Sequence, residues 1–185
     1  TRFSAGTLRE RSRDSTYQEK LWAFNAKFDK LFETGIAKHQ LIYGFDVKRL
    51  DSSDLRRGRE VFANNGLPVP AIPGDETFPL SDFPDPTINT YSLFAQDQIS
   101  WDKWTFLPAV RYDYTQLKPH ITQEFLNTVA ADGQGTVSDE NKTWHKVSPK
   151  FGLTYALTEN YTWYGQYAEG FRTPTAKALY GRFEN

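Results

Sequence analysis

The clearest regularity in the chain is an alternation of apolar and polar side chains with a period of two. In the run KWTFLPAVRYDYTQ (103–116), one parity carries Trp104, Phe106, Pro108, Val110, Tyr112 and Tyr114, and the other carries Thr105, Arg111, Asp113 and Thr115. Alternation of this kind is typical of a β-strand with one apolar and one polar face. The run therefore predicts a strand that separates two different environments.

Five further runs show the same alternation. Their apolar parities are Trp22, Phe24, Ala26 and Phe28; Leu41, Tyr43, Phe45 and Val47; Leu93, Ala95, Ile99 and Trp101; Val147, Phe151, Leu153, Tyr155 and Leu157; and Tyr161, Trp163 and Tyr167. Asp97 falls on an apolar parity, as does Lys30, which we interpret as a snorkelling side chain or a bulge. Pro108 and Pro149 each remove a ladder donor, so we expect a bulge or kink at both. The sequence predicts about six antiparallel strands.

The connections between these runs alternate between very short and very long. The short ones are ETGIAK, DK and TEN, and the long ones span about 52–86 and 116–145. The first long connection contains a charged loop segment, DLRRGRE (54–60), and a proline-rich excursion (66–86). Long loops at one end and short turns at the other are typical of bacterial outer-membrane barrels.

Bulky aromatic residues crowd the predicted short-turn ends, as Phe32, Trp101, Trp104, Tyr161 and Trp163. This placement matches the aromatic girdle of a membrane barrel. Because six strands cannot close such a barrel, we expect the chain to be a fragment of one. A soluble β-meander whose aromatics fill a core remains the alternative.

The amino-acid composition excludes several kinds of site and several classes of function. The chain has 185 residues, 16% aromatic, with no cysteine, which excludes disulfides, thiolate metal sites and cysteine nucleophiles. Its net charge of -1 provides no global attraction for nucleic acid. No apolar run approaches the length of a membrane helix, and no catalytic motif is present, so we expect no enzymatic activity.

Two segments resemble TonB-dependent outer-membrane receptors, specifically the haem and haemoglobin uptake branch. They are INTYSLFAQDQIS and KVSPKFGLTYALTENYTWYGQYAEGFRTPTAKALYG. The resemblance implies an all-β, 22-stranded transmembrane barrel of which residues 1–185 form part, with the plug domain and other strands outside this chain. It implies a monomeric receptor that imports haem, free or from haemoglobin, to the periplasm with TonB-coupled energy. The expected partners are haem or haemoglobin, the TonB complex and outer-membrane lipid, without nucleic acid.

The residues that carry the haem resemblance are Phe171, Arg172, Thr173 and Pro174, which match the FRAP box of that branch with Thr in place of Ala. Asn185 matches the first residue of the branch's second box. No histidine lies between the boxes, so Tyr180 is the candidate axial ligand of haem iron, with packing as its alternative role. Haem here is cargo and not a catalytic cofactor. Phe171, Arg172 and Pro174 are the other candidate ligand-binding residues.

Arg172 has two chemically apt roles, pairing with haem propionates or with Glu169, and we favour the second. The three histidines are His39, expected at the periplasmic end, and His120 and His145, expected in or beside the second long loop. Either of these two could be a reserve ligand, but we favour solvated side chains. Alternation places Lys27, Asp29, Asp46, Arg111, Asp113 and Lys150 toward the lumen or plug. Two other functions remain open: a ferric-siderophore receptor of the same architecture, and a soluble β-domain that binds ligands.

Overall fold

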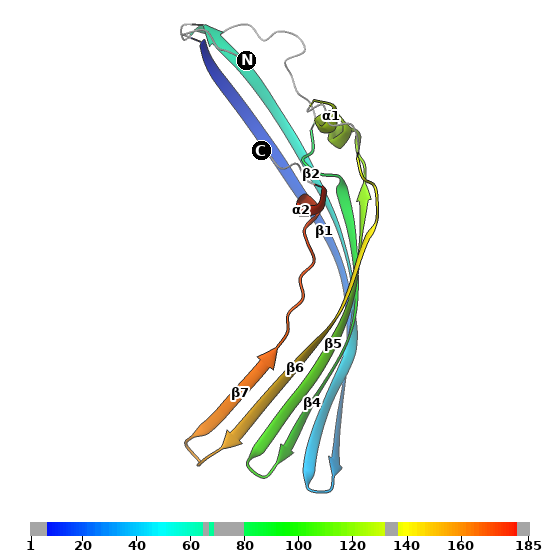
Figure 1. The fold of residues 1–185 in the computed structure, drawn as a ribbon, viewed down its shortest axis with the longest axis vertical. Helices are drawn as coiled ribbons and strands as arrows, with labels where there is room; N and C mark the ends of the chain where they lie inside the picture. Colours follow the sequence, from blue (N-terminus) through cyan, green and yellow to red (C-terminus); the bar gives the residue numbers. More distant parts are fainter. Residues whose placement is uncertain (1–6, 65–66, 69–79, 132–136, 181–185) are drawn as a thin grey trace.

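One open antiparallel sheet dominates the computed structural model, which describes residues 7–64, 67–68, 80–131 and 137–180 (Figure 1). Its strands are β1 (Thr7–Thr34), β2 (Ala37–Asn64), β3 (Leu67–Pro68), β4 (Asp85–Trp101), β5 (Trp104–His120), β6 (Lys142–Ala156) and β7 (Thr162–Ala168). The order across the sheet is β1-β2-β4-β5-β6-β7, and β3 pairs only with β2. Within the described residues, β1 and β7 are the free edges. The prediction of six main antiparallel strands is confirmed.

The short turns also form where the sequence predicts them. Gly35 and Ile36 join β1 to β2, and Gly35 adopts a positive φ of 61°, which a glycine tolerates without steric cost. Asp102 and Lys103 join β4 to β5, with Asp102 at a φ of 51°. Both hairpins lie at one end of the sheet in Figure 1.

The first long loop is shorter than predicted. The segment 54–60 is not a loop, as the sequence analysis proposed, because it belongs to β2 and pairs with residues of β1. Its polar side chains gave no alternation to recognise, but backbone hydrogen bonds do not depend on side-chain polarity. The second long loop contains a helix that the pattern did not predict, α1 (Gln123–Ala131).

Helix α1 begins at a capping residue. The amide of Phe125 donates a 3.3 Å hydrogen bond to the Thr122 hydroxyl, as expected of an N-cap. Phe125 is buried, and the hydroxyl of fully buried Thr128 accepts a 3.3 Å hydrogen bond from the Ser81 amide. The helix therefore fixes the residues that lead into β4.

The three predicted ladder irregularities have different outcomes. Lys30 pairs with Leu41 in an unbroken register, so it marks no bulge. Opposite Pro108 the β4–β5 pairing stops at Gln96 and resumes at Ile99. Because the register is the same on both sides, this is a gap in the ladder and not a bulge. The gap arises because proline has no N–H to donate. Pro149 pairs with Val110 without interruption, so the expected bulge there is wrong.

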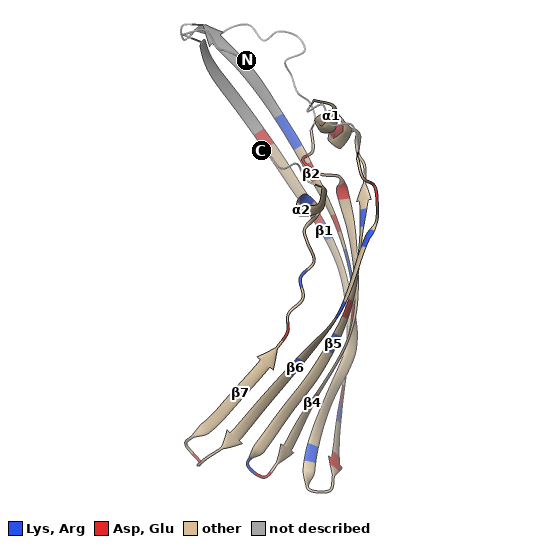
Figure 2. Cartoon of the chain, in the orientation of Figure 1, with Lys and Arg blue, Asp and Glu red and all other residues tan. Residues whose placement is uncertain are grey.

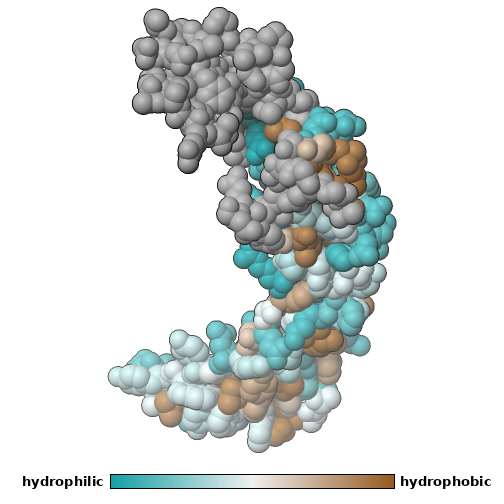
Figure 3. Space-filling model, turned by 45° about the horizontal axis from the view of Figure 1, so that its top comes forward, coloured by the Kyte–Doolittle hydropathy of each residue, from teal (hydrophilic) through white to brown (hydrophobic). Residues whose placement is uncertain are grey.

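The register gives the sheet two chemically different faces. The apolar face carries exposed large side chains along all six long strands: Trp22, Phe24, Phe28, Tyr43, Val47, Tyr91, Leu93, Val110, Tyr112, Val147, Phe151, Trp163 and Tyr167. Figure 3 shows hydrophobic residues exposed over the lower, short-turn part of the strands. The opposite, polar face carries Asp46, Ser92, Arg111 and Lys150. Such a sheet exposes its hydrophobic residues instead of enclosing them.

The buried core is small and lies at the long-loop end. Phe83, Leu117 and Ala176 form it, and Ile88, Trp144, Leu179 and Tyr180 pack against it. Ala176, Leu179 and Tyr180 belong to the short helix α2 (Ala176–Tyr180), which follows β7 through an extended segment. In the described part of the chain, neither helix is long and apolar enough to cross a membrane.

Candidate functional site

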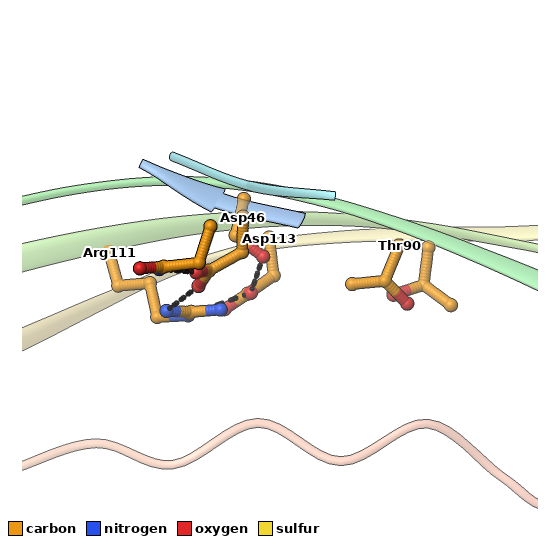
Figure 4. Close-up of polar contacts among 7 residues, drawn as sticks. Asp46, Thr90, Arg111 and Asp113 are labelled. Atoms are coloured by element: carbon orange, nitrogen blue, oxygen red, sulfur yellow. Dashed lines mark hydrogen bonds and ion pairs between the residues drawn. The ribbon is translucent and has the colours of Figure 1, made fainter. Parts of the chain in front are cut away.

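A polar cluster occupies the middle of the polar face (Figure 4). Arg111 on β5 makes two ion pairs, each 2.9 Å long, from its Nη1 to Asp46 Oδ2 and from its Nε to Asp113 Oδ1. Asn25 donates a hydrogen bond to Asp46, and Ser92 donates one of 2.6 Å to Asp113. One guanidinium thus joins carboxylates on β2 and β5, on either side of β4.

All six residues predicted to face the lumen or plug share this face. The register pairs Asn25 with Asp46, Gly44 with Phe94, and Phe94 with Arg111, so the polar positions of β1, β2, β4 and β5 lie on one face. The pairing of Ala109 with Lys150 extends this face to β6. Figure 2 shows few charges on the lower halves of β4–β7 except at the turn tips, and more charges above.

The segment that carries FRTP runs along the same side of the sheet as the polar cluster (Figures 1 and 4). Phe171 is half-buried, whereas Arg172 and Pro174 are exposed. Glu169 does not pair with Arg172, as the sequence analysis favoured, but with Lys146 at 3.1 Å. Among the described residues no carboxylate lies within ion-pair distance of Arg172. Its guanidinium is therefore available to an anionic ligand.

Tyr180 lies at the end of α2 in a packed position. Its ring contacts the small core, and its hydroxyl donates a 2.7 Å hydrogen bond to the backbone carbonyl of Glu140. Burial raises the pKa of the Tyr180 phenol; the Glu140 carboxylate adds to the increase and Lys142 opposes it. In this conformation the phenol is neutral and its hydroxyl is engaged. Asn185, the other residue of the predicted haem motif, lies outside the described residues.

The histidines are dispersed. His39 lies beside the β1–β2 turn, as predicted, stacked on Phe32 with its Nδ1 2.7 Å from Asp97 Oδ2. His120 ends β5 with its Nε2 3.0 Å from the Thr87 hydroxyl. His145 belongs to β6, near the end of that strand that adjoins the second long loop. In the part of the chain that the structure describes, no three His, Asp or Glu side chains are grouped closely enough to hold a metal ion.

Sequence reasoning missed two residues that position the loop above the sheet. Arg56 forms a 2.5 Å ion pair with Asp82, and Asp54 accepts a 3.2 Å hydrogen bond from the Asp82 amide. Asp54 and Arg56 both belong to the segment that the sequence analysis described as a charged loop. Because Arg56 and Asp82 are separated by 26 positions, no local sequence signal could have identified the pairing.

Comparisons with known proteins identify the architecture. A family model described as TonB dependent receptor-like, beta-barrel matches residues 1–185. Among solved structures, the unliganded ferric citrate transporter FecA matches with a TM-score of 0.61 and 16% identity, covering 84% of this chain. The match covers 21% of the FecA chain, so this chain spans about a fifth of it. No curated protein matches the sequence.

Proposed function

Because the chain belongs to the TonB-dependent receptor β-barrel family, we propose that it forms part of the wall of a receptor that imports an iron compound. The family consists of outer-membrane transporters and not enzymes, so the chain lies in the bacterial outer membrane and its sheet is part of a barrel. The alternative of a soluble β-domain is therefore wrong.

The observation that carries the transport proposal is the division of the sheet into two faces. An apolar face meets hydrocarbon without cost, while ion pairs such as Arg111–Asp46 require the polar interior of a large barrel. A plug domain inside that barrel, and the TonB complex acting through it, are the partners we propose for the whole receptor. The polar face would line the route that the ligand takes.

Haem is the first ligand we propose to test. The support is the FRTP match at Phe171–Pro174, the availability of the Arg172 guanidinium for a propionate, and a tyrosine where the haem branch places its ligand. For Tyr180 to bind ferric iron, its hydroxyl must leave the Glu140 carbonyl and lose its proton, which its raised pKa opposes. Haem capture would therefore involve a rearrangement of α2.

A ferric siderophore is the second candidate, and the engagement of Tyr180 favours it. A siderophore supplies its own iron ligands, so its receptor needs aromatic and arginine contacts but no tyrosinate. Phe171 and Arg172 offer both kinds of contact while Tyr180 stays packed against the core. The ferric citrate transporter named above, a ferric-chelate receptor, supports this candidate at the level of the ligand class.

The two candidates differ in one measurement on the full-length receptor purified in detergent. We expect a haem receptor to give a saturable Soret band with a phenolate charge-transfer band, and Tyr180→Phe to lose the second. Tyr161→Phe is the matched control, because Tyr161 is 71% exposed at the β6–β7 turn, at the other end of the sheet. Binding should strengthen at higher pH, since deprotonation of the phenol is required.

Each outcome assigns a ligand or a residue. If the wild-type receptor shows no saturable haem band, but ferric chelates quench its tryptophan fluorescence, the siderophore hypothesis is correct. Identical haem spectra for wild type and Tyr180→Phe would show that Tyr180 has only a packing role.

A further inference from the structure

The apolar face ends abruptly, at one step of the register. The last apolar row consists of Val47, Tyr91 and Tyr114, which pair with one another across β2, β4 and β5. The next row on the same face carries Arg49, Asn89 and Gln116 on these three strands, while Trp22 beside Arg49 keeps β1 apolar at this level. The row beyond it carries Lys20, Asp51, Thr87 and Lys118. Polarity thus changes within two residues on three neighbouring strands.

The change from apolar to polar rows lies one membrane thickness from the short turns. The lower aromatic row, Trp101, Trp104, Tyr155 and Trp163, pairs across β4–β7 beside the turns. Tyr114 is ten residues from Trp104 along β5. At about 3.3 Å per residue and a tilt of about 40°, that separation is about 25 Å, the height of a barrel's apolar band. The polar rows therefore lie at the outer surface of the membrane.

An apolar depression lies directly below the polar rows. It has a volume of about 310 Å³ and is lined on this face by the side chains of Phe45, Val47, Tyr91, Leu93, Tyr112 and Tyr114. Its walls belong to three neighbouring strands, and Tyr91 and Tyr114 pack as a tilted pair with centroids 6.3 Å apart. A hydrocarbon chain suits a concavity of this composition at this depth in the membrane.

Above the depression, cations outnumber carboxylates. The two polar rows of the described sheet hold Lys20, Arg49 and Lys118 against a single carboxylate, Asp51. Asp51 is already engaged, because Arg49 Nε lies 3.0 Å from it and the Thr87 hydroxyl donates to it at 2.7 Å. Arg49 Nη2 also donates to Asp51, at 3.1 Å, but the Arg49 side chain is still 57% exposed, so part of its guanidinium is accessible to a ligand. The rows present a net positive charge to the membrane surface.

We propose that this part of the apolar face is a binding site for the phosphorylated glycolipid of the outer leaflet, lipopolysaccharide. One acyl chain lies in the depression, and a phosphate on the sugar headgroup binds Arg49 and Lys118. Charge complementarity and depth support this occupant: the cations lie where a phosphate at the headgroup level would be, one row above the hydrocarbon. The site is on the opposite face from the proposed transport route and is independent of the transported ligand.

The test uses the full-length receptor and purified lipopolysaccharide in mixed micelles, with retained radiolabelled lipid counted per receptor after gel filtration. We expect Arg49→Gln with Lys118→Gln to weaken retention by about tenfold or more, since two charge-assisted contacts are lost. The control Lys38→Gln with Lys103→Gln removes two cations at the short-turn end and should retain lipid as wild type does. Heat-modifiable gel mobility verifies that each variant is folded.

Two further arms identify the lipid. Enzymatically dephosphorylated lipopolysaccharide should bind the wild-type receptor as weakly as the intact lipid binds the double variant. Val47→Trp, which fills the depression, should weaken both forms of the lipid. Equal retention by the double variant and wild type would overturn the proposal. Equal competition by phosphatidylglycerol would also overturn it, because it would indicate general attraction of anionic lipid.

Discussion

At the scale of single residues, the polar face is organised by Arg111. The guanidinium pairs with Asp46 and Asp113 together and offsets one of their two negative charges. The three side chains are 38%, 13% and 13% exposed, so solvent weakens these ion pairs only partly. Tyr180 is the opposite case. It is a candidate iron ligand by sequence, but in the structure packing and a hydrogen bond to a backbone carbonyl hold its side chain. The sequence identified both residues as candidates from their side-chain type, but only their contacts in the structure distinguish their roles.

Replacing Arg111 by methionine should lower the free energy of unfolding by about 1–2 kcal/mol, because two partly buried carboxylates lose their counter-charge. Urea-dependent folding of the full-length receptor in micelles measures this value. Arg172→Met, the same change at an exposed arginine, should have no effect. Combining Arg111→Met with Asp46→Asn and Asp113→Asn should recover part of the loss; a triple variant less stable than Arg111→Met would contradict the ion-pair explanation.

At the scale of elements, close strand pairing depends on particular small residues. A Cβ placed on Gly44 would lie 2.1 Å from the Ala26 carbonyl oxygen and 2.9 Å from the Phe94 ring. Gly152 is covered in the same way by Leu107, at 3.1 Å. A large side chain on one strand thus fills the space above a glycine on the next, which keeps the polar face packed.

We expect Gly44→Ala to lower the free energy of unfolding by about 1–3 kcal/mol, because β1 or the Phe94 ring must move. Gly165→Ala on β7 is the matched control, since its Cβ would meet only the edge of the Trp163 ring at 3.5 Å. The midpoint of the heat-induced gel shift compares the two variants. A midpoint for Gly44→Ala as high as for Gly165→Ala would exclude the steric constraint.

At the scale of the whole molecule, the chain is a wall with lipid on one side. Its described residues form a small buried core at one end, whereas large hydrophobic side chains are exposed along every long strand. The free edges of β1 and β7 require partners, because unpaired backbone groups cannot lie in hydrocarbon. Stability must therefore come largely from the complete barrel and the membrane.

Brominated lipids test which face meets the membrane. In single-tryptophan variants of the reconstituted receptor, Trp101 and Trp163 should be quenched strongly, and more by bromine near the headgroup than by bromine deep in the acyl chains. Trp144, which packs on the polar face beside α2, should be quenched least. Strong quenching of Trp144 with protection of Trp163 would reverse the assignment of the two faces.

The sequence by itself determined the six strands, the short turns and the two faces, because period-two alternation is a local consequence of backbone geometry. It could not determine the length of β2 or the presence of α1, since cross-strand hydrogen bonds and burial against Ser81 stabilise these segments. Only the tertiary structure brought Arg49 and Lys118 above one depression and Tyr180 to the Glu140 carbonyl. Those contacts join residues far apart in the chain, and register and packing alone decide them.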